Sequence, residues 1–476
     1  MRFGAILTVL LLIIISILAA VSIPSDGLTE LPETRYDPHD AIYIDGNSDL
    51  LNQDLVEGWP GDGSEGDPIT ISNYVIDANG TTRGIYVNNT DLHLVISGNL
   101  IYEAYDGSGR DGEGIMLKYV SNCTVRNNVV RDSYRTGIYL WYCRDINVDG
   151  NEIRDTGESF GMISLDSEGI SFMNNKVTGS NNVGVSAMRS ADVLFQGNNI
   201  SGMEEDGLRL HTSQNVVSKE NRISHCGNYG INVMVPLGNS FFHSNELIGC
   251  TLNNDRDFEY LNVPDNNTID GKPIYLYKYQ DDVSVPEDAG MIIGFRTSEM
   301  TISDTELPGY RGAVTLEECD SIEIENLTLR DGKSSLILDL CDSVTIKNST
   351  FNNISTQIIA LYSTNEVEIA GCDFSEEPTG GFRNIFFSGG SGLKFHNNTV
   401  ENIDRPLGCM HASGVRIEDN IFRGNIRYPV FMSSVSEHWI LRNEMEREGE
   451  TDGAGVLISG SEEGNIEDNV IRNFNE

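Results

Sequence analysis

Several side chains that could contact a sugar are spaced along the sequence by about 23 residues or multiples of that interval. Aromatic rings stack on sugar faces, and paired carboxylates can act on a glycosidic bond as acid and as base or nucleophile. The candidate ligand-binding residues are Lys118, Tyr139, Trp141 and His211. The candidate catalytic residues are Asp111, Glu113 and Arg209. In a lyase, acids would hold calcium against a uronate, and Arg209 or Lys118 would take the α-proton.

These residues can meet only if the chain returns to the same place once per repeat. An asparagine, one free position and an aliphatic residue recur between Val120 and Cys250. The aliphatic members are Val130, Ile153, Val177, Ile200, Ile223 and Leu247, so the interval hardly varies from one repeat to the next. Self-similarity at a fixed period of this length is typical of a solenoid.

The elements inside each repeat are expected to be strands. Apolar residues alternate with a period of two, and no repeat holds a long run at helical period. A strand unit that returns once per repeat stacks on its predecessor, and the inward aliphatic side chains then form one continuous core. The sequence therefore predicts an all-β parallel β-helix of about sixteen coils, roughly 75 Å long at the usual strand spacing.

The recurring asparagine is expected at a bend, because asparagine tolerates left-handed backbone angles. When the coils stack in register, its amide can bond the asparagine of the next coil. We therefore predict a structural role for these asparagines.

The same alternation predicts which side chains share the outer face of one sheet. One column holds Tyr86, Met116, Tyr139, Ser186, Arg209 and Asn232, and a second holds Asn88, Lys118, Trp141, His211 and Met234. Acidic residues precede this sheet, so rings and carboxylates would border one groove. Trp141 and Arg209 fall about three coils apart, roughly 14 Å, and are not expected to touch.

The chain divides into six parts. Met1-Arg2 and the apolar run that follows are typical of a secretory signal, or of an uncleaved anchor that would be the one contact with a membrane. Export to the cell surface or the medium is therefore expected. The parts are a signal or anchor at 1–23, a linker at 24–40, an N-terminal cap at 41–70, coils at 71–250, an irregular insertion at 251–295 and coils at 296–476.

The charge balance bears on the partners. The 72 acidic and 32 basic residues give a net charge of −40. Phosphate binding needs clustered lysine and arginine, so nucleic acid is not an expected partner. An extracellular polysaccharide or surface glycan is the expected one. The last coil shows no covering segment, so its end is expected either to self-associate end to end or to be truncated.

Four of the eight cysteines occupy matching positions in neighbouring coils. Cys226 precedes Cys250 by one repeat, and Cys319 precedes Cys341 in the same way. A backbone separation near the coil rise falls inside the disulfide range, and export would favour bridges. The alternative is a pair of buried stacked thiols, because in-register stacking does not fix the Cβ directions.

The chain resembles the NosD-like group of extracytoplasmic right-handed parallel β-helix proteins, and exported archaeal members most of all. The likeness spans roughly residues 40–476. It rests on the opening Ile42–Asn47 with Gly61-Asp62-Gly63, on the coil marks, and on Asn267–Tyr275 with Val285–Gly290. The resemblance implies a right-handed helix and an extracytoplasmic location. It carries no transferable catalytic motif.

The group's namesake takes part in copper-site assembly, which directs attention to soft ligands. The candidate metal ligands are Cys409 and His411, expected on one side of a strand. Calcium is a further candidate cofactor, through Asp62, Glu65 and Asp67 in the cap. A turn-rich loop is the alternative reading of those three residues.

Three functional hypotheses follow. The first is a non-catalytic surface or scaffold protein that grips glycans. The second is a polysaccharide lyase or glycoside hydrolase, and the third is a copper-handling accessory protein. Fold alone does not choose among them, because function resides in particular sites.

Overall fold

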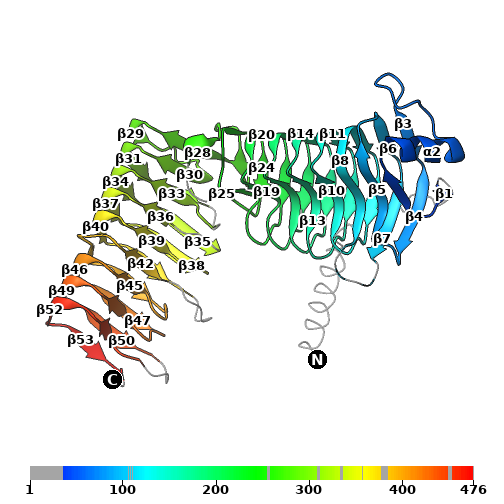
Figure 1. Ribbon diagram of the computed structural model, residues 1–476. Coiled ribbons are helices and arrows are strands. Elements are labelled where there is room, and N and C mark those ends of the chain that lie inside the picture. Colours follow the sequence, from blue (N-terminus) through cyan, green and yellow to red (C-terminus); the bar gives the residue numbers. More distant parts are fainter. Residues whose placement is uncertain are drawn as a thin grey trace, which may run out of the picture.

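The computed structural model describes residues 36–105, 107, 109, 111–254, 258–307, 311–332, 336–355, 357–376, 384–448 and 453–474. Over these ranges the chain forms an all-β parallel solenoid of about 16 turns, which confirms the predicted fold class (Figure 1). The expected signal or anchor and most of the linker lie outside the described residues. Within the described part, no helix is long and apolar enough to cross a membrane.

The solenoid has two segments that meet at an angle (Figure 1). In the first segment, each coil gives one strand to each of three stacks, named sheets 1, 2 and 3 here. Sheet 1 contains β2 (Ile42–Asp45), β5 (Arg83–Thr90), the first half of β8 (Glu113–Arg126), β10 (Thr136–Trp141), β13 (Phe160–Leu165), β16 (Val183–Met188), β19 (Leu208–His211), β22 (Ile231–Met234) and β25 (Leu252–Asn254).

Sheets 2 and 3 complete the first segment. Sheet 2 contains β3 (Ile69–Ser72), β6 (Leu94–Ser97), the second half of β8, β11 (Arg144–Asp149), β14 (Glu168–Met173), β17 (Ala191–Gln196), β20 (Gln214–Lys219), β23 (Ser240–His243) and β26 (Leu261–Asn262). Sheet 3 contains β1 (Asp37–Pro38), β4 (Tyr74–Asn79), β7 (Leu100–Tyr105), β9 (Val129–Arg131), β12 (Glu152–Arg154), β15 (Lys176–Thr178), β18 (Asn199–Ser201), β21 (Arg222–Ser224), β24 (Glu246–Ile248) and β27 (Thr268–Ile269).

The second segment repeats the arrangement as sheets 4, 5 and 6. Sheet 4 contains β28 (Lys272–Lys278), β30 (Met291–Phe295), β33 (Val314–Glu317), β36 (Leu336–Asp339), β39 (Ile359–Tyr362), β42 (Ile385–Ser388), β45 (Leu407–Met410), β48 (Val430–Ser433) and β51 (Val456–Ser459). Sheet 5 contains β29 (Asp281–Ser284), β31 (Ser298–Ser303), β34 (Asp320–Glu325), β37 (Asp342–Lys347), β40 (Asn365–Ala370), β43 (Lys394–His396), β46 (Ser413–Glu418), β49 (Ser436–Leu441) and β52 (Glu462–Glu467). Sheet 6 contains β32 (Glu306–Leu307), β35 (Thr328–Gly332), β38 (Thr350–Ile354), β41 (Asp373–Ser375), β44 (Thr399–Glu401), β47 (Ile421–Gly424), β50 (Glu444–Arg447) and β53 (Val470–Arg472).

Helix α2 (Asn47–Glu57) lies at the N-terminal end of the first segment (Figure 1). Its Leu50 is fully buried against the first core, and Trp59 packs there as well. Strand β2 already pairs in parallel with β5. The stack therefore begins inside the segment expected as the cap, and α2 is what covers its end.

The junction between the two segments consists mainly of short β-strands. Strands β25, β26 and β27 complete one more coil, with the short 3-10 helix η2 (Phe258–Tyr260) between the first two. A tight hairpin then pairs β27 with β28 in antiparallel fashion, which starts sheet 4. The insertion expected at 251–295 thus contains one short-stranded coil and the first strands of the second segment.

Strands β28 and β30 form a wall shared by both hydrophobic cores. One face of this wall carries Ile274, Met291, Ile293 and Phe295, which are buried in the core of the first segment. The other face carries Ile292, with Tyr275 and Tyr277 packed against the core of the second segment. A strand that is buried on both faces is expected to read as a continuous apolar run, as Met-Ile-Ile-Gly-Phe does.

Lys278 closes the end of the first segment from the same wall. Its Nζ donates to the backbone oxygens of Glu259 and Leu261, each at 2.9 Å. These carbonyls belong to the last coil of the first segment, where no following strand of sheet 2 pairs with them. The wall therefore covers both the apolar interior and the polar edge of that coil.

The repeated asparagines form a buried hydrogen-bonded ladder, as predicted. Each side-chain Nδ2 donates to the Oδ1 of the next asparagine at 2.8–3.1 Å. The first segment's ladder runs through Asn99, Asn128, Asn151, Asn175, Asn198, Asn221, Asn245 and Asn267. The predicted bend role is wrong, because the left-handed φ belongs to the preceding residue, as in Asn127 (53°) and Asn174 (52°).

We predict that Asn198→Ala lowers the stability of the first segment by about 3 kcal/mol, because it leaves buried polar groups without partners. The Asn198 amide donates to Asn221 Oδ1 and to the Phe172 carbonyl, and it accepts from the Asn175 backbone N–H. The urea midpoint measures the loss. The neighbouring Asn199 is exposed, so Asn199→Ala is the matched control. Equal midpoints for the two variants would contradict the prediction.

Candidate functional site

The strand register of sheet 1 confirms the predicted outer columns. Tyr139 pairs with Met116 in the coil before it, and Trp141 pairs with Lys118. Further along the same columns lie Ser186, which pairs with Arg209, and Met188, which pairs with His211. Side chains separated by one repeat in the sequence are therefore neighbours on one face.

In each coil from β5 to β22, one residue with a left-handed φ turns the chain from sheet 1 toward sheet 2. Its φ is 52° at Tyr142 and 46° at Arg189. Equivalent positions in successive coils form a second line of outward side chains beside sheet 1. We call this line the corner column, and it comprises Asn89, Tyr119, Tyr142, Asp166, Arg189, Thr212 and Val235.

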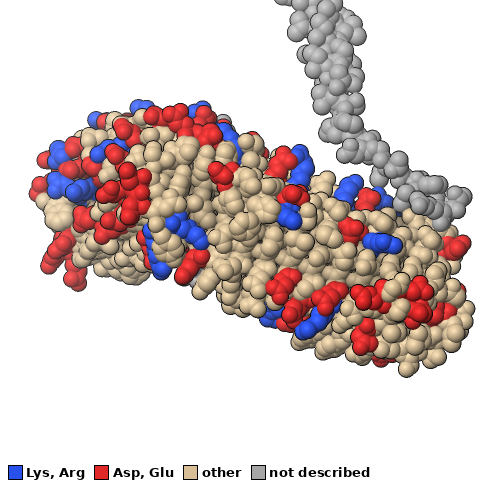
Figure 2. Space-filling model, turned by 90° about the horizontal axis from the view of Figure 1, so that it is seen from above, with Lys and Arg blue, Asp and Glu red and all other residues tan. Residues whose placement is uncertain are grey.

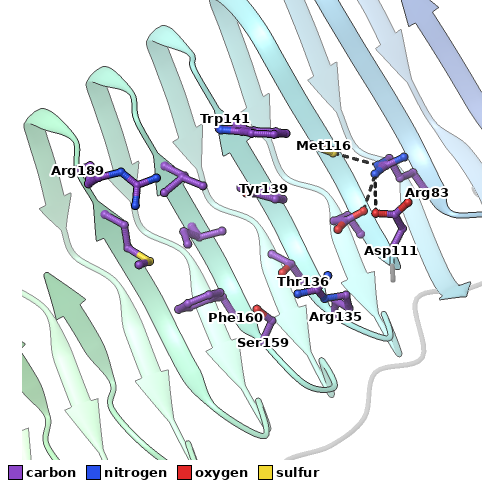
Figure 3. Close-up of a pocket in the computed structure, with 14 residues that line it drawn as sticks. Arg83, Asp111, Met116, Arg135, Thr136, Tyr139, Trp141, Ser159, Phe160 and Arg189 are labelled. Carbon is purple, nitrogen blue, oxygen red and sulfur yellow. Dashed lines mark hydrogen bonds and ion pairs between the residues drawn. The ribbon is translucent and has the colours of Figure 1, made fainter. Parts of the chain in front are cut away.

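A pocket of about 310 Å³ opens on the outer face of sheet 1 (Figure 3). Figure 3 shows Arg83 and Asp111 at one end, Arg189 at the other, and the rings of Tyr139 and Trp141 between them. This volume is at the lower limit of small-ligand sites. The lining residues are Arg83, Asp111, Glu113, Met116, Arg135, Thr136, Tyr139, Trp141, Ser159, Phe160, Ile163, Leu165, Met188 and Arg189.

Arg83 bridges the two predicted acids at one end of the pocket. Its Nη2 lies 3.0 Å from Asp111 Oδ1, and its Nε lies 3.0 Å from Glu113 Oε2. Burial raises the pKa of Glu113, although the charge of Arg83 opposes the shift. The structure thus brings Asp111 and Glu113 together, because both side chains form an ion pair with Arg83.

Aromatic side chains form the middle of the pocket. The rings of Tyr139 and Trp141 stack with centroids 6.2 Å apart. Lys118 Nζ lies 4.4 Å from the centroid of the Trp141 ring, which is a cation–π contact. Burial, with a smaller contribution from the charge of Glu113, raises the pKa of Tyr139 to about 12, so its hydroxyl is a neutral hydrogen-bonding group at pH 7.

A second ion pair lies at the opposite end. Arg189 Nε donates to Asp166 Oδ1 at 2.7 Å, and Arg189 Nη2 donates to Asp166 Oδ2 at 2.8 Å. This bidentate pair lowers the pKa of Asp166. The pocket therefore runs between two arginine–carboxylate clusters with an aromatic and apolar floor.

Three predicted catalytic or ligand-binding residues do not line the pocket, and Lys118, which lies over the Trp141 ring, is the nearest of them. Arg209 donates to Glu205 Oε2 and Asp206 Oδ2, each at 2.6 Å, and it does not line the pocket. It stands four coils beyond Met116 in its column, roughly 19 Å at the strand spacing, so it cannot act with the acids at Asp111 and Glu113. His211 is also outside the pocket, where its Nδ1 lies 3.1 Å from the Thr212 hydroxyl.

The sequence reasoning missed Arg83, Arg135, Phe160 and Arg189. A signal for two of them was present in the column arithmetic. Arg83 is in register with Glu113, and Phe160 is in register with Thr136. Both side chains lie three residues before a position of the outer column, Arg83 before Tyr86 and Phe160 before Ile163, so the register could have located them although the period-two alternation could not.

The predicted copper ligands point in different directions. Cys409 is completely buried in β45, and burial raises its thiol pKa to about 12. His411 is exposed and has a φ of 48°. The expectation that both face one side is wrong, because the left-handed turn at His411 ends the strand alternation.

The cap loop also shows no metal arrangement. The Asp62 carboxylate accepts the backbone N–H of Ser64 at 2.9 Å, and hydrogen bonds from Ser64 lower the pKa of Asp62. This is the geometry of a turn. Across the described residues, no group of three or more His, Cys, Asp or Glu side chains is arranged to hold a metal ion. Calcium binding through Asp62, Glu65 and Asp67 stays a prediction from the sequence.

All eight cysteines are free thiols, so the stacked-thiol alternative describes the structure and the disulfide alternative does not. Cys226 nevertheless lies against Cys250, and Cys319 lies against Cys341, within thiol hydrogen-bonding distance. The hydrogen bond from Cys341 lowers the pKa of Cys319, against the effect of burial. A lowered thiol pKa favours the thiolate that attacks in disulfide formation.

Comparison with known proteins identifies the class. A family model described as a right-handed β-helix region matches residues 35–163, 113–285, 242–400 and 312–473. The chain therefore belongs to the right-handed β-helix family. No curated protein matches the sequence.

Solved structures with a similar fold are distant. One is the surface adhesin PfbA of Streptococcus pneumoniae, at 9% identity over 87% of this chain and 84% of that one, with a TM-score of 0.32. Another is pectate lyase Pel9A, at 9% identity over 62% and 78%, with a TM-score of 0.31. A third is the A-module of mannuronan C-5 epimerase AlgE4 of Azotobacter vinelandii, at 12% identity over 87% and 99%, with a TM-score of 0.29. All three TM-scores are below 0.5, so these similarities carry no conclusion about this chain.

We predict that mild oxidation links Cys226 to Cys250 and Cys319 to Cys341, since the two thiols of each pair occupy matching positions in neighbouring coils and interact with each other. Each link closes a loop of about one repeat and should stabilise the fold by roughly 3 kcal/mol. Non-reducing peptide mapping identifies the links, and the buried Cys409 serves as an unlinked internal control. Recovery of all eight cysteines in alkylated form after oxidation would refute the pairing.

Proposed function

We propose that this protein is an exported or cell-surface glycan-binding protein, of the NosD-like kind that its sequence resembles, and that the pocket on sheet 1 is its binding site. The observation that carries the proposal is the set of three aromatic side chains, Tyr139, Trp141 and Phe160, in one open pocket. Binding sites are typically lined by aromatic and apolar groups with a few placed polar ones. Sugars present apolar ring faces and hydroxyls, which match that composition.

Binding without catalysis is the simpler function for this arrangement. Asp111 and Glu113 are both paired to Arg83, and the candidate base Arg209 lies outside the pocket. Paired charges give fixed hydrogen-bonding groups for sugar hydroxyls. The pocket is therefore better suited to holding a sugar than to moving protons.

The acidic surface is consistent with an extracellular carbohydrate partner. On the face shown in Figure 2, basic side chains are interspersed with acidic ones over both segments. A nucleic acid would need a continuous basic track. Export itself is proposed from the apolar run after Met1-Arg2.

We predict that Trp141→Ala weakens glycan binding at least tenfold, which corresponds to about 1.4 kcal/mol, because it removes the largest ring of the pocket. A glycan array selects the ligand, and calorimetry on that ligand measures the affinity. Trp439→Ala is the matched control, since Trp439 is a half-buried tryptophan on the outer face of β49 in the other segment. Equal affinities for the two variants would contradict the assignment.

Glycan cleavage is a second candidate function, and the environment of Glu113 favours it. A buried carboxyl with a raised pKa beside another carboxyl, here Asp111, is the pattern of a general acid in glycoside hydrolysis.

If cleavage occurs, we predict that Glu113→Gln abolishes the release of reducing ends from the bound polysaccharide. Activity of the unmodified protein should fall as pH rises through the raised pKa of Glu113, because a general acid must hold its proton. A reducing-end assay across pH measures both effects, with Glu152→Gln on the outer face of β12 as a control. A substrate that is bound and released intact at every pH leaves binding as the function.

A further inference from the structure

A pair of stacked, exposed tyrosines lies beside the pocket. Tyr119 and Tyr142 belong to the corner column in successive coils, and their side chains are 49% and 44% exposed. Their rings are parallel, with 2° between the planes and 5.0 Å between the centroids. Large aromatic surface left in water is a common mark of a binding surface.

These rings continue the aromatic surface of the pocket. The Trp141 ring stacks on Tyr142 with centroids 5.5 Å apart and 24° between the planes. Trp141 also stacks on Tyr139, with centroids 6.2 Å apart and 14° between the planes. The four rings therefore form one band that starts in the pocket and passes over the corner between sheets 1 and 2. We call it the aromatic band.

Lys118 supplies a polar group along this band. Its Nζ lies 4.4 Å from the centroid of Trp141 and 5.4 Å from that of Tyr119. A lysine ammonium has three donors, so it can hold the rings and still donate to a ligand hydroxyl. The aromatic band thus combines ring faces with a hydrogen-bond donor, as the pocket does.

The tyrosine pair is local to the coils of the pocket. In the neighbouring coils the corner column holds Asn89 before the pair, and Asp166, Arg189 and Thr212 after it. The left-handed turn between sheets 1 and 2 therefore does not require tyrosine. Asp166 and Arg189 of the same column form the ion pair at the far end of the pocket. The corner column and the pocket are consequently parts of one surface.

We propose that Tyr119 and Tyr142 form a second subsite, which takes a further sugar unit of a chain whose first units occupy the pocket. The ligand class is then an oligosaccharide or polysaccharide that crosses the corner along the aromatic band. This proposal rests on the proposed glycan-binding function and extends it. The band has two pairs of rings, one inside the pocket and one outside it, so affinity should rise with chain length and then level off.

The test compares chain lengths on the full chain. The probes are cello-, xylo-, manno- and galacturono-oligosaccharides of one to six units, measured by calorimetry. We predict that Tyr119→Ala/Tyr142→Ala lowers the affinity for the longest bound oligosaccharide roughly tenfold and leaves that for the shortest unchanged. Tyr119→Phe/Tyr142→Phe keeps the ring faces and should bind as the unmodified protein does.

Tyr279→Ala is the matched control, because Tyr279 is an exposed tyrosine with a left-handed φ at the equivalent corner of the second segment. The second subsite is refuted if the double alanine variant, with an unchanged thermal melting curve, binds long chains normally. If Trp141→Ala then loses both short and long chains, the proposed function stands without the second subsite. Unchanged binding by the double alanine variant and by Trp141→Ala refutes both, as does a lack of binding to every probe.

Discussion

The in-register stacking of one coil on the next is the constraint on which the whole molecule depends. A single coil buries too little apolar surface to be stable, and its backbone groups pair only with neighbouring coils. In the first segment the stacking is fixed by the buried amide ladder from Asn99 to Asn267, in which each side chain satisfies the polar groups of the next coil. A slip by one residue would expose the aliphatic side chains and break the ladder at once.

The second segment keeps the stacking with a different set of buried contacts. Among its described residues, the amide ladder runs through Asn398, Asn420, Asn443 and Asn469. Before that point the equivalent turn holds Ser349 and Cys372, and an aromatic stack begins in the core, where Phe351 and Phe374 lie 4.9 Å apart. Ring stacking also accompanies the amide ladder elsewhere, as where Phe172 stacks on Phe195, so both contacts stabilise the same register between coils.

The features of the molecule that depend on the length of one repeat could be predicted from the sequence. The fold, the asparagine ladder, the outer columns and the proximity of Lys118, Tyr139 and Trp141 all follow from the length of one repeat, so they were predictable. The turns do not follow from the period. Whether Arg209 meets the acids of its own turn, and whether His411 adopts a left-handed φ, depends on loop conformations that alternation does not describe. The wall of β28 and β30 was hidden for a related reason, since burial on both faces removes the alternating pattern itself.

That wall has a mechanical consequence for the bent solenoid. Strands β28 and β30 are the last layer of the first segment's core and the first layer of the second segment's core. Neither segment can therefore unfold at the junction without exposing the core of the other. Repeat arrays usually lose cooperativity over distance, but here the junction couples the two segments where a simple hinge would have separated them. A force on either segment would be borne at the junction by tightly packed side chains, so sheet 1 keeps a fixed direction relative to the rest of the molecule.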